Sequence, residues 1–485
     1  MTPAQSHLVD SMRSRFGPRI AVTDPDDIAP WLTDWRGRYH GRAPAILAPA
    51  STGEVQAIVA AARHGGVALV PQGGNTSMVG GATPPADGSA LILSLRRMNR
   101  VRAIDPVANL AVADAGVILA DLHAAADAVG RRFPLTLGAR GSATIGGLAS
   151  TNAGGTQVLR WGTMRGLVAG VEAVLPDGSL HDGLVALKKD NRGYDLNQLL
   201  IGAEGTLGVI TAATLRLAPA IAARAVAWAG VASPHAALRL LRLIEADSDA
   251  IESFEILPDE TLALVLGHIP DTRAPLTGPH AWHVLIEAVA GDFDREPPAM
   301  LLERLLARAL AEGVIEDATL AASEAQAEAF WRIRHSISES ARAQGPQTQH
   351  DISVPVDRMP DFLTLDARAI EAALPGTSAS GFGHLGDGNV HFHVRAPADS
   401  DPARWYAEQA PLVTRVVHDH VVVAGGSISA EHGIGQMKLA ELERLGPPAR
   451  LAALRAIKAA FDPANLFNPG KLVRPEPVTD LCGNG

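Results

Sequence analysis

The chain has 485 residues, more than a single compact core usually contains, so we expect two or three domains. Its formal net charge of −10 argues against a nucleic-acid-binding protein, because affinity for nucleic acid comes mostly from lysine and arginine. The only cysteine, Cys482, excludes disulfides, iron–sulfur clusters and cysteine-rich zinc sites, so any metal must be held by His, Asp or Glu.

The N-terminal stretch 1–17 lacks the apolar segment of a signal peptide. No uncharged apolar run in the chain reaches the roughly 18 residues of a membrane-spanning helix. We therefore expect a cytoplasmic protein that spans no membrane, with a peripheral membrane contact left open.

A mixed α/β domain is predicted after an N-terminal segment, residues 1–40, and extends over residues 41–220. Ser51 and Glu54 fit a capping box, and apolar residues then recur at helical spacing until Gly65 and Gly66. A strand follows at once and runs into a glycine-rich loop. The further predicted elements are strands within 90–95, 108–117, 168–179 and 204–219 and a helix within 120–130.

Two loops in this domain, Pro71–Pro84 and Gly138–Gly155, are rich in Gly, Ser, Thr and Asn. Backbone N–H groups without Cβ atoms beside them can turn toward an anion, and a diphosphate is the natural ligand. One such loop alone is more often a surface turn, but two in one domain favour the anion site. Neither has Rossmann or Walker spacing. Glycines at 381, 383 and 386 fit G-x-G-x-x-G, but a turn and a strand follow, so we reject that match.

From about residue 222 the pattern changes to long amphipathic helices alternating with strands, which indicates a second domain over 221–424. The clearest helical patterns lie within 234–247, 297–313 and 323–345. A last segment, 425–485, contains a helical stretch that ends at Asn-Pro-Gly, which cannot continue a helix.

The stretch Gly381–Val394 ("GFGHLGDGNVHFHV") combines three histidines and an aspartate with four glycines. If Asp387 and Gly388 form a two-residue type I′ turn, His384 pairs directly with His391, and both imidazoles point to one face. His393 follows two residues later on the same face. Isolated histidines are usually satisfied hydrogen-bonders, but two that converge across a turn favour a metal site.

A third ligand is expected from the segment Ser427–Lys438, where Glu431 and His432 precede Gly433. Adjacent side chains diverge, so both need not bind one ion. We assign Glu431 as a ligand and His432 as a general base beside it.

Arg334 lies on the apolar stripe of the helical pattern around residues 330–341, whereas Arg332 projects away from it. A guanidinium on a buried face needs an anionic partner. That partner is either the carboxylate of a small acid substrate or an internal Asp or Glu, and the spacing leaves both open.

Six motifs in order, "PQGGNTSMVGG", "GSATIGGLASTNAGG", "IGAEGTLGVIT", "GHLGDGNVH", "SAEHGIG" and "NLFNPGKL", resemble those of the FAD-linked oxidases of the vanillyl-alcohol oxidase superfamily. The resemblance covers about residues 30–473 and is strongest to the D-2-hydroxyacid dehydrogenase branch. It implies an α+β fold, with a two-part FAD-binding domain and a substrate domain built on an antiparallel, ferredoxin-like sheet. It also implies that 425–485 packs back on the FAD-binding domain.

By this resemblance FAD is noncovalent, because Asn75 stands where several relatives carry a tethering histidine. The residues that the resemblance places at the cofactor are Pro71, Gln72, Gly73, Gly74, Asn75, Thr76, Ser77, Gly138, Ser142, Gly146, Gly147, Thr151, Asn152, Gly154, Glu204, Gly208, Ile210 and Asn468.

The same resemblance matches His384, His391 and Glu431 to ligands of a divalent metal, with zinc expected, and His432 to the catalytic base. The residues it places at the substrate are Arg334, Ser338, Asn389 and His393. Two positions depart from the usual pattern for hydroxyglutarate. Gln349 replaces a lysine, and His393 replaces an asparagine, so the distal end of the substrate is in question.

The implied reaction is oxidation of a D-2-hydroxy acid to the 2-oxo acid by hydride transfer to FAD. D-2-hydroxyglutarate is the first expectation, with D-lactate or glycolate as the alternative. A metallohydrolase and a noncatalytic flavin or metal binder are kept as more remote readings. We expect an electron-transfer flavoprotein or a quinone as electron acceptor, and leave a homodimer open.

Overall fold

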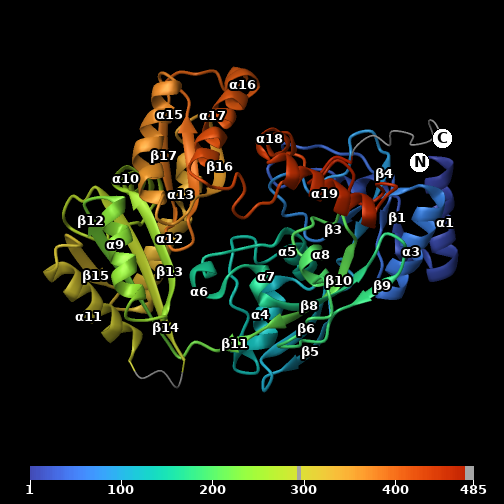
Figure 1. Cartoon of the computed structure of the whole chain (residues 1–485), viewed down its shortest axis with the longest axis horizontal. Helices are drawn as coiled ribbons and strands as arrows, with labels where there is room; N and C mark the ends of the chain where they lie inside the picture. Colours follow the sequence, from blue (N-terminus) through green and yellow to red (C-terminus); the bar gives the residue numbers. More distant parts are fainter. Residues whose placement is uncertain (292–295, 476–485) are drawn as a thin grey trace. The chain divides into compact units, whose positions relative to one another are not determined.

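The computed structural model describes residues 1–291 and 296–475, so Cys482 lies outside the described part. The chain divides into two compact units (Figure 1). The first unit contains Met1–Gly154, Thr163–Pro219 and the described part of His432–Gly485, and the second contains Gly155–Gly162 and Ala220–Glu431. Residues 155–162, which the sequence places with the FAD-binding domain, thus group with the second unit.

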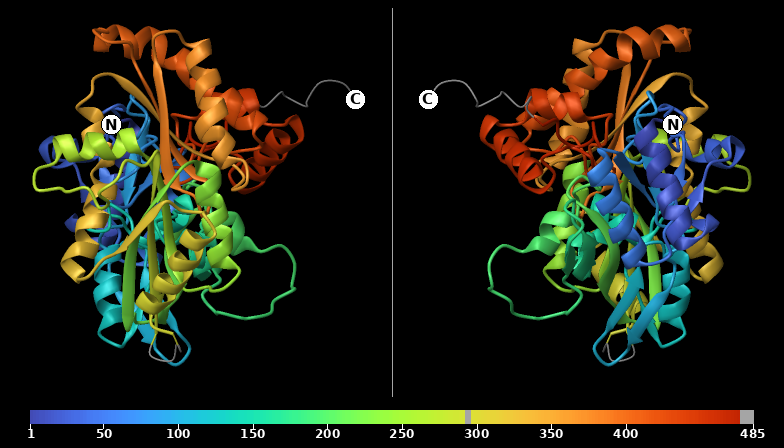
Figure 2. Two further views of the ribbon diagram at one scale, coloured as in Figure 1. Left: turned by 90° about the vertical axis from the view of Figure 1, so that its left-hand side faces the viewer. Right: turned by 90° about the vertical axis from the view of Figure 1, so that its right-hand side faces the viewer.

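The first unit contains a four-stranded sheet in the order β1-β2-β4-β3, with β2, β4 and β3 parallel. Helix α3 precedes β3 and begins at the predicted N-cap, because the side chain of Ser51 accepts the Glu54 N–H at 3.3 Å. The predicted capping box is only half formed, since the Glu54 carboxylate accepts the N–H of Ala50 at 2.7 Å. Gly66 ends α3 with φ +63°. Figure 2 shows α1 beside α3, and both contribute to one core with β3 and β4. The bounds are α1 Pro3–Phe16, η1 Pro18–Ile20, β1 Ala21–Val22, α2 Pro25–Ile28, η2 Ala29–Trp31, β2 Ile46–Leu47, α3 Thr52–Gly65, β3 Ala68–Gln72 and β4 Ala90–Ser94.

A five-stranded antiparallel sheet, β5-β6-β10-β8-β9, completes the first unit. A short pair, β11 and β7, and several helices accompany it. The bounds are β5 Val101–Asp105, β6 Leu110–Asp114, α4 Leu119–Asp127, β7 Arg131–Arg132, α5 Ile145–Thr151, α7 Met164–Leu167, β8 Val168–Val174, β9 Leu180–Asp182, α8 Leu196–Leu200, β10 Val209–Arg216 and β11 Ala218–Pro219.

The C-terminal segment, with helices α18 (Leu439–Leu445) and α19 (Pro448–Phe461), is bonded into the first unit. The Leu69 N–H donates to the Leu466 carbonyl at 2.7 Å, so residues around 467 continue the four-stranded sheet beside β3. Buried Lys458 donates to the carbonyls of Thr206 and Phe467, each at 2.9 Å. A lysine buried this deeply is stabilised only when its ammonium group is fully bonded.

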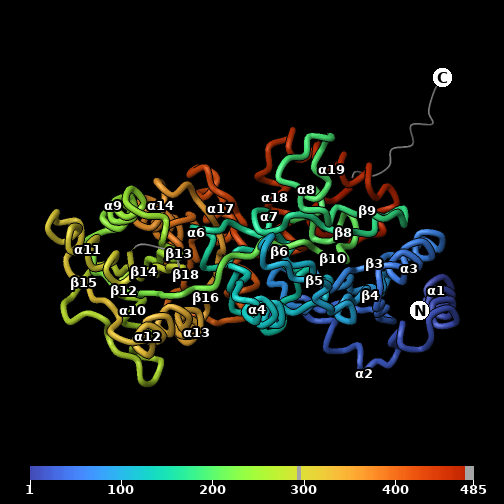
Figure 3. The backbone as a smooth tube through the Cα atoms, turned by 90° about the horizontal axis from the view of Figure 1, so that it is seen from below, coloured from blue at the N-terminus to red at the C-terminus, as the bar shows by residue number. Residues whose placement is uncertain are grey.

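The second unit is built on a seven-stranded antiparallel sheet in the order β15-β12-β14-β13-β17-β18-β16. Helices cover both faces, with α9 and α11 on one and α10, α12 and α13 on the other (Figure 3). Alternate residues of β12 show this division, because Ala227 and Ala229 pack with α9 and α11 whereas Val226 and Trp228 pack with α12.

The remaining bounds in the second unit are α6 Val158–Trp161, β12 Ala223–Val231, α9 Pro234–Glu245, β13 Ile251–Pro258, α10 Asp259–His268, β14 Trp282–Ala290, α11 Pro298–Ala311, β15 Asp317–Leu320, α12 Glu324–His335, α13 Ile337–Arg342, β16 Gln347–Ser353, α14 Met359–Asp361, η3 Phe362–Asp366, α15 Ala367–Ala373, β17 Ser378–His384, β18 Asn389–Arg395, α16 Pro402–Arg404, η4 Trp405–Gln409 and α17 Ala410–Val423. The helical pattern within 323–345 is divided between α12 and α13 at Ser336. Among the described residues, no helix is long and apolar enough to cross a bilayer.

Candidate active site

The hairpin predicted within Gly381–Val394 forms, but its two strands, β17 and β18, pair in a different register from the predicted one. His384 pairs with Asn389, and Phe382 pairs with His391, so the loop is Leu385–Gly388 and the predicted two-residue turn is wrong. The reason is a long-range bond, because the Leu385 N–H donates to the Phe254 carbonyl of β13 at 3.0 Å and so leaves the hairpin ladder. Gly388 has φ +79°, as expected of a turn glycine.

The two imidazoles converge despite this error. The observed register differs from the predicted one by two residues on one strand, and a shift by two keeps every side chain on its face. His384 and His391 are therefore diagonal neighbours, with ring centroids 5.5 Å apart. Gly386 permits a close approach, since a Cβ there would lie 2.7 Å from the Leu159 side chain.

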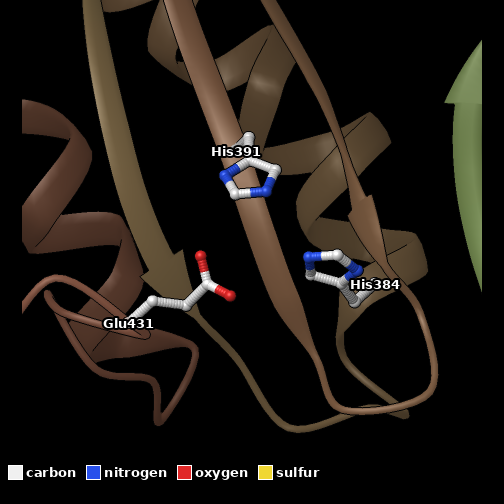
Figure 4. Close-up of side chains that lie close together, drawn as sticks. All are labelled: His384, His391 and Glu431. Atoms are coloured by element: carbon white, nitrogen blue, oxygen red, sulfur yellow. The ribbon is translucent and has the colours of Figure 1, made fainter. Parts of the chain in front are cut away.

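Glu431 completes a group with these histidines. One potential ligand atom from each of His384, His391 and Glu431 lies within 4.8 Å of the others, and Figure 4 shows the three side chains pointing toward one another. A loop brings in Glu431 after Ser427, whose backbone pairs with Ser353 at the end of β16. Two imidazoles and one carboxylate suit a divalent transition metal with open coordination positions.

His393 lies on the same face of β18 but is not in that group of three. Its ring contacts Phe382, with centroids 5.3 Å apart, and it pairs in register with Gln349 of β16. The two positions that depart from the family pattern are thus cross-strand neighbours, on the same strand faces as His391.

Rows of paired residues explain how four strands supply one polar surface. Glu255, His384 and Asn389 are opposite one another across β13, β17 and β18, and the row continues to Ser353 of β16. The next row joins Phe382, His391 and Asp351. Because side chains two residues apart share a face, both rows project to the side covered by α12.

The buried charges in these rows affect one another. Burial alone would raise the pKa of Glu255, but the positive charges of Arg334 and His384 outweigh it and lower that pKa to about 2. Burial would lower the pKa of His384, and the negative charge of Glu255 outweighs it and raises that pKa to about 9. Burial and the charge of Asp351 raise the pKa of Glu431 to about 8. His384 and Glu431 must lose their protons to ligate a metal.

Arg334 has an internal partner, which was one of the two alternatives left open. Its Nε donates to the Glu255 carboxylate at 2.6 Å, and its guanidinium lies 5.0 Å from the centre of the Phe382 ring. The remaining guanidinium N–H groups are not bonded to Glu255, so a second anion can use them. Ser338 is exposed on α13, and Arg332 is exposed as predicted.

Asn389 and Asp351 support the loop that carries Glu431. The Asn389 amide donates to the Asp351 carboxylate at 3.1 Å and to the Ile352 carbonyl at 2.9 Å. The Asp351 carboxylate in turn accepts the Glu431 backbone N–H at 3.0 Å. Neither Asp351 nor Glu255 was among the site residues predicted from the sequence. For Glu255 the available signal was an acidic residue within the largely apolar strand β13, because such residues are rarely buried unless paired, whereas Asp351 lies in the polar strand β16 and had no such signal.

In the first unit the two glycine-rich loops lie against each other. A Cβ at Gly73 would stand 2.1 Å from Thr144 Oγ1, and one at Gly74 would stand 1.8 Å from the Ser142 carbonyl oxygen. Only glycine fits at these two positions. Thr144 Oγ1 and Gln72 Oε1 are buried and have no hydrogen-bond partner among the described residues, so a ligand can use both.

Family models of known proteins match both parts of the chain. Residues 43–183 match a model described as a FAD binding domain, and residues 221–472 match one described as FAD linked oxidases, C-terminal domain. The chain belongs to the FAD-linked oxidase family. It is a FAD-dependent oxidoreductase.

Three curated relatives of this FAD-linked oxidase are named D-2-hydroxyglutarate dehydrogenase. This chain is 35% identical, over 96% of its length, to the mitochondrial D-2-hydroxyglutarate dehydrogenase of Arabidopsis thaliana. The match spans 81% of that protein. Identity to the bovine mitochondrial protein of that name is 37%, over 95% of this chain and 82% of the other. Identity to the D-2-hydroxyglutarate dehydrogenase of Xanthomonas citri is 36%, over 93% of both chains.

The fold is that of the vanillyl-alcohol oxidase type, as the sequence predicted. A solved structure of p-cresol methylhydroxylase with substrate bound matches 98% of both chains with a TM-score of 0.75. The sequence identity is 14%, so this similarity concerns the fold. A 4-ethylphenol oxidase from Gulosibacter chungangensis matches with a TM-score of 0.69 over 98% of both chains.

The two glycine-rich loops of this FAD-linked oxidase fit a diphosphate. They approach each other closely at Gly73 and Gly74, and the buried atoms Gln72 Oε1 and Thr144 Oγ1 have no hydrogen-bond partner among the described residues. Asn75, in the left-handed conformation with φ +53°, donates its side-chain amide to the Thr33 carbonyl at 2.9 Å. An amide is not a nucleophile, which agrees with noncovalent FAD. Of the other expected cofactor contacts, Gly147 and Thr151 lie in α5, Gly138 lies in the loop before this helix, and Gly154 lies in the segment after it.

Several expected cofactor residues also hold the first unit together. The Glu204 carboxylate accepts the N–H groups of Ile434 and Gly435, both at 2.7 Å, and burial raises its pKa. The Asn468 amide donates to the carbonyls of Gly81 and Glu204. Four other expected cofactor residues are constrained by the local structure. Asn152 ends α5 with φ +51°, and Ile210 is buried in β10. Gly208 has φ +153°, and a Cβ at Gly146 would meet Ala115.

Proposed function

We propose that this protein is a metal-dependent flavoprotein dehydrogenase that oxidises a D-2-hydroxy acid, with D-2-hydroxyglutarate as the first choice, to the 2-oxo acid. The observation that carries the proposal is the convergence of His384, His391 and Glu431 beside the Arg334–Glu255 pair. The names of the curated relatives support the substrate class.

Two groups would supply chemistry that the side chains lack. FAD, when bound at Pro71–Ser77 and Gly138–Gly155, accepts a hydride. A divalent metal, zinc in the first instance, when bound by the His384, His391 and Glu431 group, lowers the pKa of a hydroxyl that it coordinates.

The chain's own residues then bind and deprotonate the substrate. The free guanidinium N–H groups of Arg334 bind the carboxylate next to the reacting carbon, because a planar fork matches a carboxylate. His432, which follows Glu431 in the chain, receives the proton of the α-hydroxyl as general base. The chain can turn sharply after His432 because Gly433 adopts a φ of +80°. Gln349 and His393 face the distal end of the substrate.

D-lactate or glycolate is the second candidate substrate. Gln349 favours it, because the neutral amide provides no cation for a second carboxylate. A relative from Schizosaccharomyces pombe, 34% identical over 93% of this chain, is named a putative mitochondrial D-lactate dehydrogenase.

The cellular setting stays a prediction. We propose an electron-transfer flavoprotein or a quinone as acceptor, a cytoplasmic location and a homodimer as the form to test first. The plant and bovine relatives are named as mitochondrial proteins, and the name of the Xanthomonas relative gives no compartment.

A dye-reduction assay with D-2-hydroxyglutarate, D-lactate, D-malate and glycolate, with and without a chelator, tests this proposal. We expect chelation and His384→Ala each to lower turnover by at least about a hundredfold while FAD stays bound. His350→Asn is the control, because His350 lies on β16 between two residues of the polar face and so points to the opposite face. Full activity of His384→Ala, or of the chelated enzyme, contradicts the metal-dependent reaction.

A further inference from the structure

Glu255 contacts both the proposed metal ligand His384 and the proposed substrate-binding residue Arg334. Its side chain is fully buried in the middle of β13. Oε1 accepts from His384 Nδ1 at 2.5 Å, and Oε2 accepts from Arg334 Nε at 2.6 Å. Each carboxylate oxygen therefore has its own partner.

The bond to His384 decides which ring nitrogen can bind a metal. An ionised carboxylate can only accept, so the Nδ1 of His384 carries a proton. In the neutral ring Nε2 then holds the free lone pair, which is the form that ligates. Within residues 1–291 and 296–475 the His384 ring has no other hydrogen-bond partner, so nothing else there selects this tautomer.

The bond to Arg334 fixes the direction of the guanidinium. Arg334 is 8% exposed, and its charge would be buried without compensation if Glu255 were neutral. Because Nε donates to Glu255, the N–H groups on the far side of the planar guanidinium point away from Glu255 and can bind a second anion.

We propose that Glu255 is a positioning residue, which selects the metal-binding tautomer of His384 and aligns Arg334 with the same carboxylate. This inference rests on the proposed function, since it presupposes a metal at His384. A purely structural ion pair would stabilise the fold without affecting metal affinity.

The substitution Glu255→Gln separates these roles. Glutamine has one acceptor oxygen, so it cannot accept from both His384 and Arg334. If its oxygen stays with Arg334, its NH₂ group faces Nδ1 of His384 and selects the tautomer with the proton on Nε2. We expect the affinity for Zn²⁺ to fall 10- to 100-fold, measured by competition with a chromogenic chelator. The flavin absorbance of the same samples should stay unchanged.

Glu252→Gln is the matched control. Glu252 lies on the same strand, is 1% exposed, and bonds Trp161 Nε1 at 2.8 Å, with Arg160 3.6 Å away. It touches neither His384 nor Arg334, so its variant should bind Zn²⁺ like the wild type even where the thermal midpoint falls.

The outcomes are distinct. Wild-type Zn²⁺ affinity in Glu255→Gln overturns the inference, whatever happens to activity. If the wild type itself fails to bind Zn²⁺, the metal in the proposed function is overturned first and this inference falls with it. If Glu255→Gln does not fold, Glu255→Asp replaces it, because both acceptors are kept but retracted by one methylene. We expect at least a threefold loss of affinity there, and unchanged affinity overturns the inference.

Discussion

Gln349 is the residue that we propose to distinguish between substrates with one and two carboxylates. It pairs with His393 across β16 and β18, two residues from Asp351 on the same strand face, and it is half-buried. The polar face at this position therefore contains an amide beside an imidazole, without a fixed positive charge. A substrate with a second carboxylate gains little there beyond neutral hydrogen bonds.

Replacing Gln349 with lysine should favour dicarboxylic substrates. A charge-assisted hydrogen bond to the distal carboxylate adds on the order of 1.4 kcal/mol, which corresponds to about a tenfold lower KM for D-2-hydroxyglutarate. D-lactate has no distal carboxylate, so its KM should stay within about twofold. Steady-state dye reduction with both substrates measures the effect, with Gln349→Met as the uncharged control. An equal change for both substrates would show that residue 349 does not face the distal end.

Glu172 joins four elements of the first unit. Its carboxylate accepts from Thr52 at the start of α3, from Thr211 of β10, and from Arg102 of β5 through both terminal nitrogens. Burial would raise the pKa of Glu172, but the hydrogen bonds from Arg102, Thr52 and Thr211 outweigh it and lower that pKa. A carboxylate with a lowered pKa stabilises the folded state above its unfolded pKa, and this contribution is lost as the pH falls through the folded pKa.

Glu172→Gln should therefore destabilise the first unit in a pH-dependent way. At pH 7 we expect a loss of about 1.5–3 kcal/mol in the free energy of unfolding, because hydrogen bonds to a charged group are lost. The difference from the wild type should shrink below about pH 4.5, where the unfolded carboxylate is protonated. Hydrogen exchange of β8 peptides in urea at pH 7 and pH 4 measures it, with the exposed Glu303→Gln as control. A difference of the same size at both pH values would contradict this role.

At the level of elements, local patterns were predictable from the sequence and long-range partners were not. The N-cap of α3 and its glycine stop depend on residues within one turn, so the sequence predicted both. The predicted register of the hairpin was wrong because Leu385 bonds to Phe254 of β13, which lies 131 residues earlier in the chain. The partner of Arg334 stayed open because Glu255 is 79 residues away.

The convergence of the metal-binding group was predictable for a different reason. Period-two alternation in a strand fixes the face of a side chain under any register shift by an even number of residues. His384 and His391 therefore met although their predicted pairing was wrong. The placement of residues 155–162 in the second unit had no comparable signal, because it depends on partners far along the chain. Trp161 bonds Glu252 of β13, 91 residues later, and Leu159 packs against Gly386 in the hairpin loop, 227 residues later.

For the whole molecule, the residues that we propose for FAD and those that we propose for a metal belong to different units. Each unit has its own apolar core. The first glycine-rich loop and residues 138–154 of the second belong to the first unit, and His384, His391 and Glu431 all belong to the second. A ligand that binds only the folded form stabilises the part of the chain that holds it. FAD and a metal should therefore protect different segments.

Hydrogen exchange of protein freed of FAD and metal tests this separation. FAD at a hundred times its Kd should stabilise β8 peptides by about 2.7 kcal/mol, and Zn²⁺ at the same ratio should stabilise β13 and β17 peptides by a similar amount. The substitution His384→Ala should abolish the protection by Zn²⁺ and leave the protection by FAD intact, since only the former depends on an imidazole of the second unit. Equal protection of both sets of peptides by either ligand alone would mean that the two units unfold as one. In that case each ligand would stabilise the entire chain, and the separate cores would not confer separate stabilities.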